Sequence, residues 1–311
     1  MKYFLSILVT LLSNITFSEY VDASPGHCAP SEGPVLQVLG SGGPIADDGR
    51  ASTAYLVWID GKSRFLVDAG GGIFLRFGEA GARFEDLDHI AISHFHTDHS
   101  TDLVALLKSG YFSRRINPLS ISGPAAGGDY PGLNEYLKRL LSPDSGAYAY
   151  LDGYLDGSDG LVMLETGEIN THLQEKSTVY SDPTGDIDIL ALGVPHGPVP
   201  TLAYRIHIGQ KSIVFAGDQN GNSRAFIDFA RGADILVMHM PVPENIGGAG
   251  RKLHAPPSII GNIAAETAAG TLVLSHFMAR SLYNMEENLK VIRSRYNGSL
   301  VIVNDLDCII L

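Results

Sequence analysis

Apolar positions along the chain fall into short runs typical of buried strands and into longer segments with a helical repeat. The order strand, turn, helix runs through the chain twice, which favours an α/β fold: an αββα sandwich of two mixed sheets packed face to face, with helices outside. No linker interrupts the pattern, so 24–311 are predicted to form one domain. The predicted strands are 35–39, 54–59, 65–67, 90–92, 119–121, 187–192, 202–208, 212–216, 235–238, 271–274, 300–303 and 308–311, and the predicted helices are 79–87 (running into a loop), 103–111, 133–141, 258–269 and one from Asn284 to near Gly298.

One turn carries an unusual density of side chains that bind metals. Three histidines and an aspartate, His94, His96, Asp98 and His99, fall within six residues between a predicted strand and a predicted helix. Imidazole nitrogens and a carboxylate oxygen suit zinc and similar metals. In an extended segment His94 and His96 project to the same side, whereas Asp98 and His99 turn into the helix. The spacing favours two adjacent metal ions; the alternative is a surface cluster of histidines without metal.

Further candidate ligands follow later strands. His196 lies in a turn of glycine and proline after the strand 187–192, where a histidine is well placed to bind a metal. Asp218 follows the strand 212–216, and His276 follows 271–274. His239 ends the strand 235–238, and His254 precedes the helix 258–269; a structural role is the alternative for both.

The run His94-x-His96-x-Asp98-His99 resembles the signature of the metallo-β-lactamase superfamily, and the other candidates occur in the order expected for it. The resemblance implies that His94, His96 and His196 hold one metal, that Asp98, His99 and His276 hold a second, and that Asp218 bridges them. It also implies that Asp68 is a buried residue that orients the ligand loop. Two divalent ions are expected, with zinc favoured by the nitrogen-rich site and manganese or iron left open.

The chemistry implied by this resemblance is hydrolysis. Two such ions lower the pKa of a bridging water toward neutrality, so that hydroxide attacks the substrate. Asp98 would orient this nucleophile. His254 is the candidate general acid that protonates the leaving group, unless that group is already a good anion such as a phenolate.

The segment 254–258, with His276 in Ser275-His276-Phe277, resembles the ribonuclease Z branch of the superfamily. That branch usually has a glutamate after the histidine equivalent to His239, and Met240 stands there in this chain, with Glu244 as a candidate substitute. Its basic tRNA-gripping arm corresponds to an acidic, tyrosine-rich stretch, 142–160, which is expected to form a loop or lid. The tyrosines 148, 150 and 154 would pack this loop onto the body or contact an aromatic substrate.

The layout resembles exported zinc-dependent arylsulfatases of this fold in four stretches: 49–52, 193–198, 239–240 and 275–281. Arg50 or Arg280 would hold a sulfate oxygen or form structural ion pairs. The formal net charge is −12 and no long basic run occurs, which disfavours a nucleic-acid partner. The expected function is therefore hydrolysis of a small ester, an aryl sulfate or a phosphodiester. Alternatives are a lactam or lactone hydrolase, a tRNA 3′-end endonuclease and a metal-binding protein without turnover.

The N-terminus resembles an export signal. Lys2 precedes a mostly apolar stretch, and Val21-Asp22-Ala23 approximates a cleavage site, so 1–23 are predicted to be a signal peptide. The alternative is an uncleaved anchor, although the apolar run is short for a spanning helix. A periplasmic or secreted protein, free of the membrane after cleavage, is expected. In that oxidising compartment Cys28 and Cys308 form either a disulfide or two free buried thiols. Homo-oligomerisation stays open.

Overall fold

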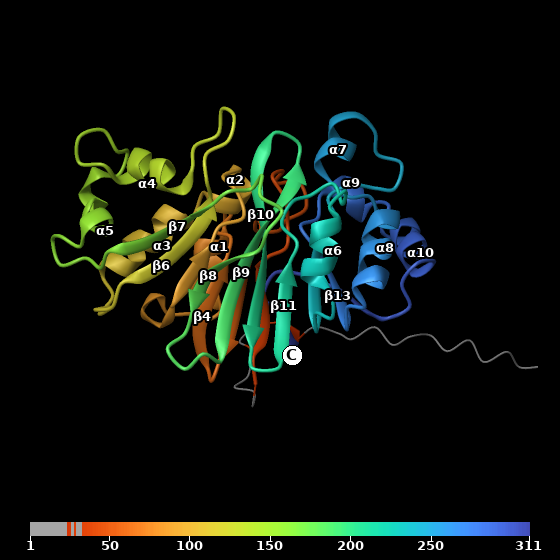
Figure 1. Cartoon of the computed structure of the whole chain (residues 1–311), viewed down its shortest axis with the longest axis horizontal. Coiled ribbons are helices and arrows are strands. Elements are labelled where there is room, and N and C mark those ends of the chain that lie inside the picture. Colours follow the sequence, from red (N-terminus) through yellow and green to blue (C-terminus); the bar gives the residue numbers. More distant parts are fainter. Residues whose placement is uncertain (1–23, 26–27, 29–32) are drawn as a thin grey trace, which may run out of the picture.

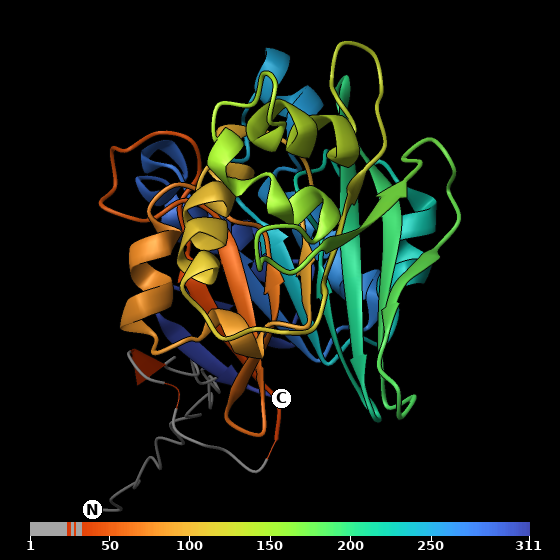
Figure 2. The same cartoon turned by 90° about the vertical axis from the view of Figure 1, so that its left-hand side faces the viewer.

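The computed structural model describes residues 24, 25, 28 and 33–311. Two sheets pack face to face, and helices cover the outer face of each sheet (Figures 1 and 2). This arrangement confirms the predicted αββα sandwich. The predicted signal peptide, 1–23, lies outside the described residues and stays a prediction. Among the described residues, no helix is long and apolar enough to cross a membrane.

The first sheet has eight strands in the order β1-β15-β2-β3-β4-β5-β6-β7. From β4 to β7 the neighbouring strands run parallel, and the remaining pairs are antiparallel. Its strands are β1 (Ser24–Pro25), β2 (Val35–Gly40), β3 (Ala54–Ile59), β4 (Lys62–Val67), β5 (His89–Ala91), β6 (Leu119–Pro124), β7 (Leu164–Ile169) and β15 (Asp307–Ile310). The helices of this half are α1 (Ile73–Glu79), α2 (Thr97–Ser100), α3 (Leu103–Tyr111), α4 (Leu133–Leu141) and α5 (Gly153–Asp156).

The second sheet has seven strands in the order β14-β13-β12-β11-β10-β9-β8. From β11 to β14 the neighbours run parallel, and from β8 to β11 they are antiparallel. Its strands are β8 (Ser177–Ser181), β9 (Ile187–His196), β10 (Val199–Ile208), β11 (Lys211–Phe215), β12 (Ile235–His239), β13 (Thr271–Ser275) and β14 (Ser299–Ile302). The helices of this half are α6 (Arg224–Ala230), α7 (Gly248–Leu253), α8 (Pro257–Thr267), α9 (Ala279–Leu282) and α10 (Met285–Arg293).

Three apolar layers hold the sandwich together. Alternate side chains of both sheets, such as Leu36, Tyr55, Ile189 and Val237, form a fully buried layer between the sheets. A second layer lies between the first sheet and its helices, and a third between the second sheet and its helices. Each buried side chain of this size contributes about 1.5–3 kcal/mol by leaving water. The sheets therefore form a rigid support for the turns at their ends.

The predicted helix 79–87 is not present in the structure. The helix lies earlier, as α1, and only a short 3₁₀ turn, Phe84–Asp86, follows. Ile73 and Phe77, four residues apart, bury one face of α1, which begins after Gly72 at φ 92°. Gly81, at φ 71°, then turns the chain away. The glycine-rich run before α1 hid this helix, because glycine weakens helices in general.

The acidic, tyrosine-rich segment 142–160 does not cover the ligand turns. It packs beside α3 and α4 at the outer edge of the first sheet, where α5 lies in Figure 1. Tyr154 is fully buried, and its hydroxyl donates a hydrogen bond to the Leu107 carbonyl at 2.7 Å. Tyr148 and Tyr150 are largely exposed. The lid expectation is therefore wrong, and the packing interpretation is confirmed for Tyr154.

A disulfide joins Cys28 to Cys308, 280 residues apart in the chain. It lies where β1 pairs antiparallel with β15, with Ser24 opposite Cys308. Of the two arrangements that the sequence left open, the structure has the bridge.

Candidate metal centre

The ligand turns meet at one end of the sandwich, near α2 and α7 in Figure 1. They follow β5, β9, β11 and β13, as the hydrophobic pattern predicts. All seven predicted ligands are brought together there, six of them buried and His96 half-buried: His94, His96, Asp98, His99, His196, Asp218 and His276.

The first predicted ligand set forms a compact group. His94, His96, His196 and Asp218 each offer one ligand atom, and these atoms all lie within 4.8 Å of one another. His94 Nε2 lies 2.9 Å from His96 Nδ1, and His196 Nε2 lies 3.6 Å from Asp218 Oδ2. Three imidazoles and a carboxylate around one point are a donor set typical of zinc.

The second set lies on the other side of Asp218. His99 Nε2 is 3.7 Å from Asp218 Oδ2, and His276 Nε2 is 3.4 Å from Asp218 Oδ1. Asp98 closes the group, with its Oδ2 3.6 Å from His99 Nε2 and 3.8 Å from His276 Nε2. The carboxylate of Asp218 thus faces both sets, as a bridging ligand requires.

Hydrogen bonds at Nδ1 orient the histidines. Asp68 Oδ2 accepts from His99 Nδ1 at 2.8 Å and from Ser93 Oγ at 2.9 Å. Because the Ser93 hydroxyl donates to Asp68, its oxygen is free to accept from His94 Nδ1 at 3.0 Å. Asp68 also accepts from the Ser93 backbone N–H at 2.7 Å. The geometry therefore matches the structural role expected of Asp68: it fixes the ligand loop so that the Nε2 atoms of His94 and His99 face the other candidate ligands.

The two later histidines are held in the same way. His196 Nδ1 donates to the Leu253 carbonyl at 2.9 Å. Thr53 Oγ1 donates to the Gly42 carbonyl at 3.0 Å, so this hydroxyl accepts from His276 Nδ1. The sequence did not single out Thr53 or Leu253, because no local pattern marks a partner that is distant along the chain.

Three buried nitrogen atoms at the centre have no hydrogen-bond partner among the described residues: the Nε2 atoms of His99, His196 and His276. Unpaired buried polar atoms are costly and rare in folded proteins. Here they converge on two carboxylates, which is the arrangement that a bound cation satisfies. The residues present therefore fit divalent metal ions.

The charged groups at the centre shift one another's pKa values. Burial opposes charging of Asp218, but the imidazoles of His276, His254 and His99 hold the pKa of its carboxyl well below the ordinary value. Burial also opposes charging of His99, but the carboxylates of Asp68, Asp98 and Asp218 raise its pKa well above the ordinary value. Metal binding at His99 Nε2 would therefore displace a proton.

His239 is more closely engaged than the sequence indicated. Its Nδ1 donates to Asp218 Oδ1 at 2.7 Å, and the Tyr55 hydroxyl lies 3.0 Å from its Nε2. Both ring nitrogens are thus occupied, which fits a role in orienting Asp218, and one ligand atom of His239 also lies within 4.8 Å of those of His99, Asp218 and His276. Its position at the end of a buried strand was the available signal.

His254 lies beside the two sets. Its Nδ1 is 3.8 Å from Asp218 Oδ2 and has no hydrogen-bond partner in the part of the chain that the structure describes. Its ring centre lies 5.2 Å from that of His196. Burial lowers the pKa of His254 to about 4. Glu244 accepts a hydrogen bond from the Ser258 backbone N–H at the start of α8, so it is engaged in holding that helix end.

The two arginines considered as sulfate ligands have structural partners. Arg50 donates to Ser41 Oγ at 2.6 Å, to the Val303 carbonyl at 3.1 Å and to Asn304 Oδ1 at 2.8 Å. Arg280 Nε donates to the Pro241 carbonyl at 2.9 Å. These contacts favour the structural alternative for Arg50, whose guanidinium is largely occupied.

Curated relatives match most of the chain. A ribonuclease Z from Mycolicibacterium gilvum (strain PYR-GCK) is 28% identical over 289 residues, covering 87% of this chain and 94% of the relative. A ribonuclease Z from Mycobacterium bovis (strain BCG / Pasteur 1173P2) is 28% identical over 293 residues, covering 87% and 96%. These relatives contradict the expectation that nucleic acid is disfavoured, and they give no support to the arylsulfatase interpretation.

Solved structures share the fold. The metallo-beta-lactamase fold protein YhfI from Bacillus subtilis has a TM-score of 0.68 and 22% identity, covering 89% of this chain and 98% of that one. The short form of human tRNase Z has a TM-score of 0.67 and 18% identity, covering 88% and 98%.

The family model described as the metallo-beta-lactamase superfamily matches residues 47–253, which is more than half of the 311 residues. That range holds six of the seven histidine and aspartate ligands of the two sets and the anchor Asp68; among the seven, only His276 lies beyond it. The geometry of the centre and the match to this model agree: the chain is a member of the metallo-beta-lactamase superfamily.

Proposed function

We propose that this protein is a metal-dependent phosphodiesterase of the ribonuclease Z kind, which hydrolyses a phosphodiester bond in a nucleic acid. The observation that carries the proposal is the pair of ligand sets that share Asp218, with three unpaired Nε2 atoms directed at them. The relatives named ribonuclease Z, similar over 87% of the chain, supply the substrate class.

The metal ions would be held by the predicted ligands. His94, His96 and His196 would hold one ion, and Asp98, His99 and His276 the other, with Asp218 between them. His239 lies near the second set, but its two hydrogen bonds make Asp98 the better fourth ligand. When bound, two divalent ions supply Lewis acidity: they activate water and offset the charge of the phosphate.

The chain's own residues would position water and deliver a proton. Asp98 accepts a hydrogen bond from the attacking water. Asp218, which accepts a hydrogen bond from His239, holds the two ligand sets at a fixed separation, and the Tyr55 hydroxyl holds the ring of His239 in turn. Water attacks phosphorus and gives one proton to Asp98, the bond from phosphorus to one sugar oxygen breaks, and protonated His254 gives its proton to that oxygen. The phosphate itself would raise the pKa of His254, because a nearby negative charge favours imidazolium.

The negative net charge does not oppose this function as strongly as we expected. The value of −12 counts side chains only, and bound divalent cations would place positive charge where the phosphate binds. The sequence has no long basic run that could bind the backbone of a long duplex. This favours a substrate that the protein contacts mainly near the cleaved bond.

The test measures cleavage of a short RNA with an unpaired 3′ extension by protein loaded with zinc or manganese. An aryl sulfate and a chromogenic β-lactam serve as comparison substrates. We expect RNA cleavage that falls at least 10²-fold in His196→Ala, while His207→Ala, a histidine of β10 outside both sets, keeps its activity. Metal-loaded protein that turns over the sulfate or the lactam but no phosphodiester would overturn the proposal.

A further inference from the structure

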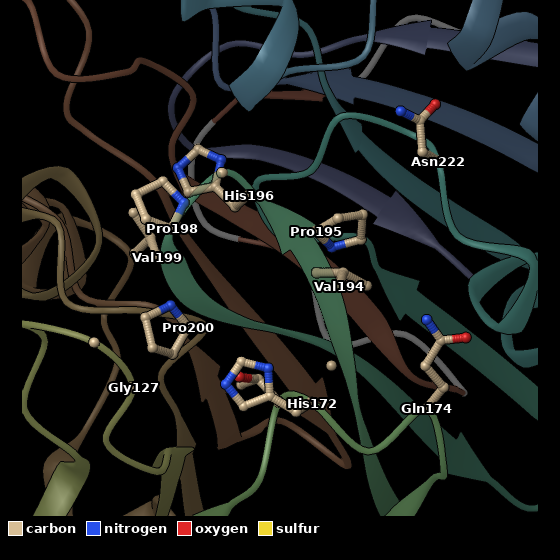
Figure 3. Close-up of a pocket in the computed structure, with 14 residues that line it drawn as sticks. Gly127, His172, Gln174, Val194, Pro195, His196, Pro198, Val199, Pro200 and Asn222 are labelled. Carbon is tan, nitrogen blue, oxygen red and sulfur yellow. The ribbon is translucent and has the colours of Figure 1, made fainter.

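A cavity of about 340 Å³ opens beside the first ligand set (Figure 3). Its walls come from the turn between β9 and β10, from Gly127 and Gly128, from the segment 171–174 before β8, and from Asn222. His196 both lines this cavity and belongs to the first ligand set. The cavity is therefore adjacent to the place where the phosphate of a substrate would bind. Its volume lies in the range of small-ligand sites.

The lining of the cavity is polar, but the described residues that form it include no Lys, Arg, Asp or Glu. Pro195, Pro198 and Pro200, with Val194 and Val199, supply flat apolar surface, and His172, Gln174 and Asn222 supply donors and acceptors. Phosphate sites in proteins use cationic side chains or helix N-termini, and neither lines this cavity. A neutral, flat ligand with hydrogen-bonding edges is the better match.

The three polar side chains are available to a ligand. His172, Gln174 and Asn222 are exposed, and within the described part of the chain none of these side chains makes a hydrogen bond. The wall behind them is closely packed: a Cβ at Gly193 would lie 2.0 Å from the Thr171 carbonyl, and one at Gly127 would lie 2.8 Å from Pro200 Cγ. Glycine at these two places lets the segments approach and form the cavity.

We infer that this cavity binds the nucleobase next to the cleaved phosphodiester; the inference rests on the proposed function and names what that site recognises. Amide side chains such as Gln174 and Asn222 match the donor and acceptor pair on the edge of adenine. Imidazole and proline faces suit stacking with a base that is not paired in a helix. The substrate class is therefore a single-stranded end, with adenine the best-matched base.

The first experiment separates this inference from the proposed function, because it needs neither metal nor cleavage. Adenosine, which has no phosphate, is titrated into metal-free protein and followed by nuclear magnetic resonance. We expect saturable binding that weakens at least fivefold in the double variant Gln174→Ala/Asn222→Ala. Gln210→Ala, an exposed glutamine in the turn between β10 and β11, should bind as the wild type does. The inference would be overturned if none of the four nucleosides bound at roughly 10 mM, a concentration that would detect even a weak site. It would also be overturned if the double variant bound adenosine as tightly as the wild type.

The second experiment uses cleavage. An abasic nucleotide beside the cleaved bond should lower kcat/KM at least tenfold in the wild type but have little further effect in the double variant, because the variant no longer contacts the base. Equal sensitivity of both proteins to the abasic site would contradict the inference. If adenosine binds as described but no phosphodiester is cleaved, the cavity assignment stands and the proposed function fails.

Discussion

Single hydrogen bonds determine which nitrogen each histidine of the centre presents. His94, His99, His196 and His276 each donate from Nδ1 to an oxygen supplied by the protein, so each presents Nε2 to the centre. The partners are a hydroxyl, a carboxylate, a backbone carbonyl and a second hydroxyl, taken from different parts of the chain. Such anchoring reduces the rotamer freedom that metal binding would otherwise have to remove.

His89 leads to a prediction about pH. It is fully buried on β5, between the hydroxyls of Ser120 and Ser122 at 2.8 Å each, and burial lowers its pKa from 6.5 to about 3. The folded state therefore holds it neutral, whereas the unfolded chain takes up a proton as the pH falls below 6.5. Its contribution to stability is complete above pH 6.5 and is lost as the pH falls toward 3, by about 2 kcal/mol at pH 5.

The measurement is urea unfolding of metal-free protein at pH 7 and pH 5, for the wild type and His89→Asn. We expect the variant to lose about 2 kcal/mol less than the wild type over this interval, since asparagine does not titrate. The other histidines titrate in both proteins, so their effect cancels when the two losses of stability are subtracted. Equal losses would show that His89 is not held neutral.

His254 leads to a prediction about leaving groups. A general acid matters little when p-nitrophenolate leaves and much when a sugar alkoxide leaves. We therefore expect His254→Ala to hydrolyse bis(p-nitrophenyl) phosphate at nearly the wild-type rate but to cleave RNA about 10²–10⁴-fold more slowly. Equal loss on both substrates, with unchanged zinc content, would instead indicate a structural role.

At the scale of the elements, the hydrophobic pattern predicted the strands that carry the ligands. The runs before His94, His196, Asp218 and His276 are mostly apolar because each of their strands has a neighbour on both sides and is largely buried. The edge strands β7 and β8 were missed, since most of their side chains face water and show no apolar run. The sequence likewise located the ligands but not their anchors, because Thr53 and His276 are 223 residues apart.

The turn at Gly70 offers a test of how elements position the centre. A Cβ at Gly70 would lie 2.2 Å from the Asp98 carbonyl, and the adjacent Ala69 N–H donates to the His99 carbonyl at 2.7 Å. We expect Gly70→Ala to move α2, to weaken zinc binding at least tenfold and to destabilise the fold by about 1–3 kcal/mol. Competition with a chromogenic chelator and thermal unfolding measure the two effects.

Gly78 in α1 is the matched control, because a Cβ there would meet nothing within 4 Å. Gly78→Ala should bind zinc as the wild type does and gain about 0.5–1 kcal/mol, since alanine favours the helix. If Gly70→Ala and Gly78→Ala had the same zinc affinity and stability, the hypothesis that close packing of the Gly70 turn positions α2 would be wrong.

At the scale of the whole molecule, the disulfide between Cys28 and Cys308 closes nearly the entire described chain into one loop. Such a link restricts the unfolded chain, and for long loops the stabilisation reaches up to about 5 kcal/mol. It also lies where β1, the edge strand of the first sheet, pairs with β15, a strand of four residues. None of the predicted metal ligands lies on either strand, so stability and metal binding should respond separately.

We therefore expect the variant Cys28→Ala/Cys308→Ala to unfold with a free energy about 2–5 kcal/mol lower than the wild type while binding the same amount of zinc. A mild reductant should lower the stability of the wild type to that of the variant and leave the variant unchanged. If the reductant did not change the free energy of unfolding of the wild type, even after unfolding and refolding, the disulfide would not contribute to stability. Dependence on the bridge would favour folding in an oxidising compartment, because cytosolic thiols are kept reduced, and would support the predicted export of this protein.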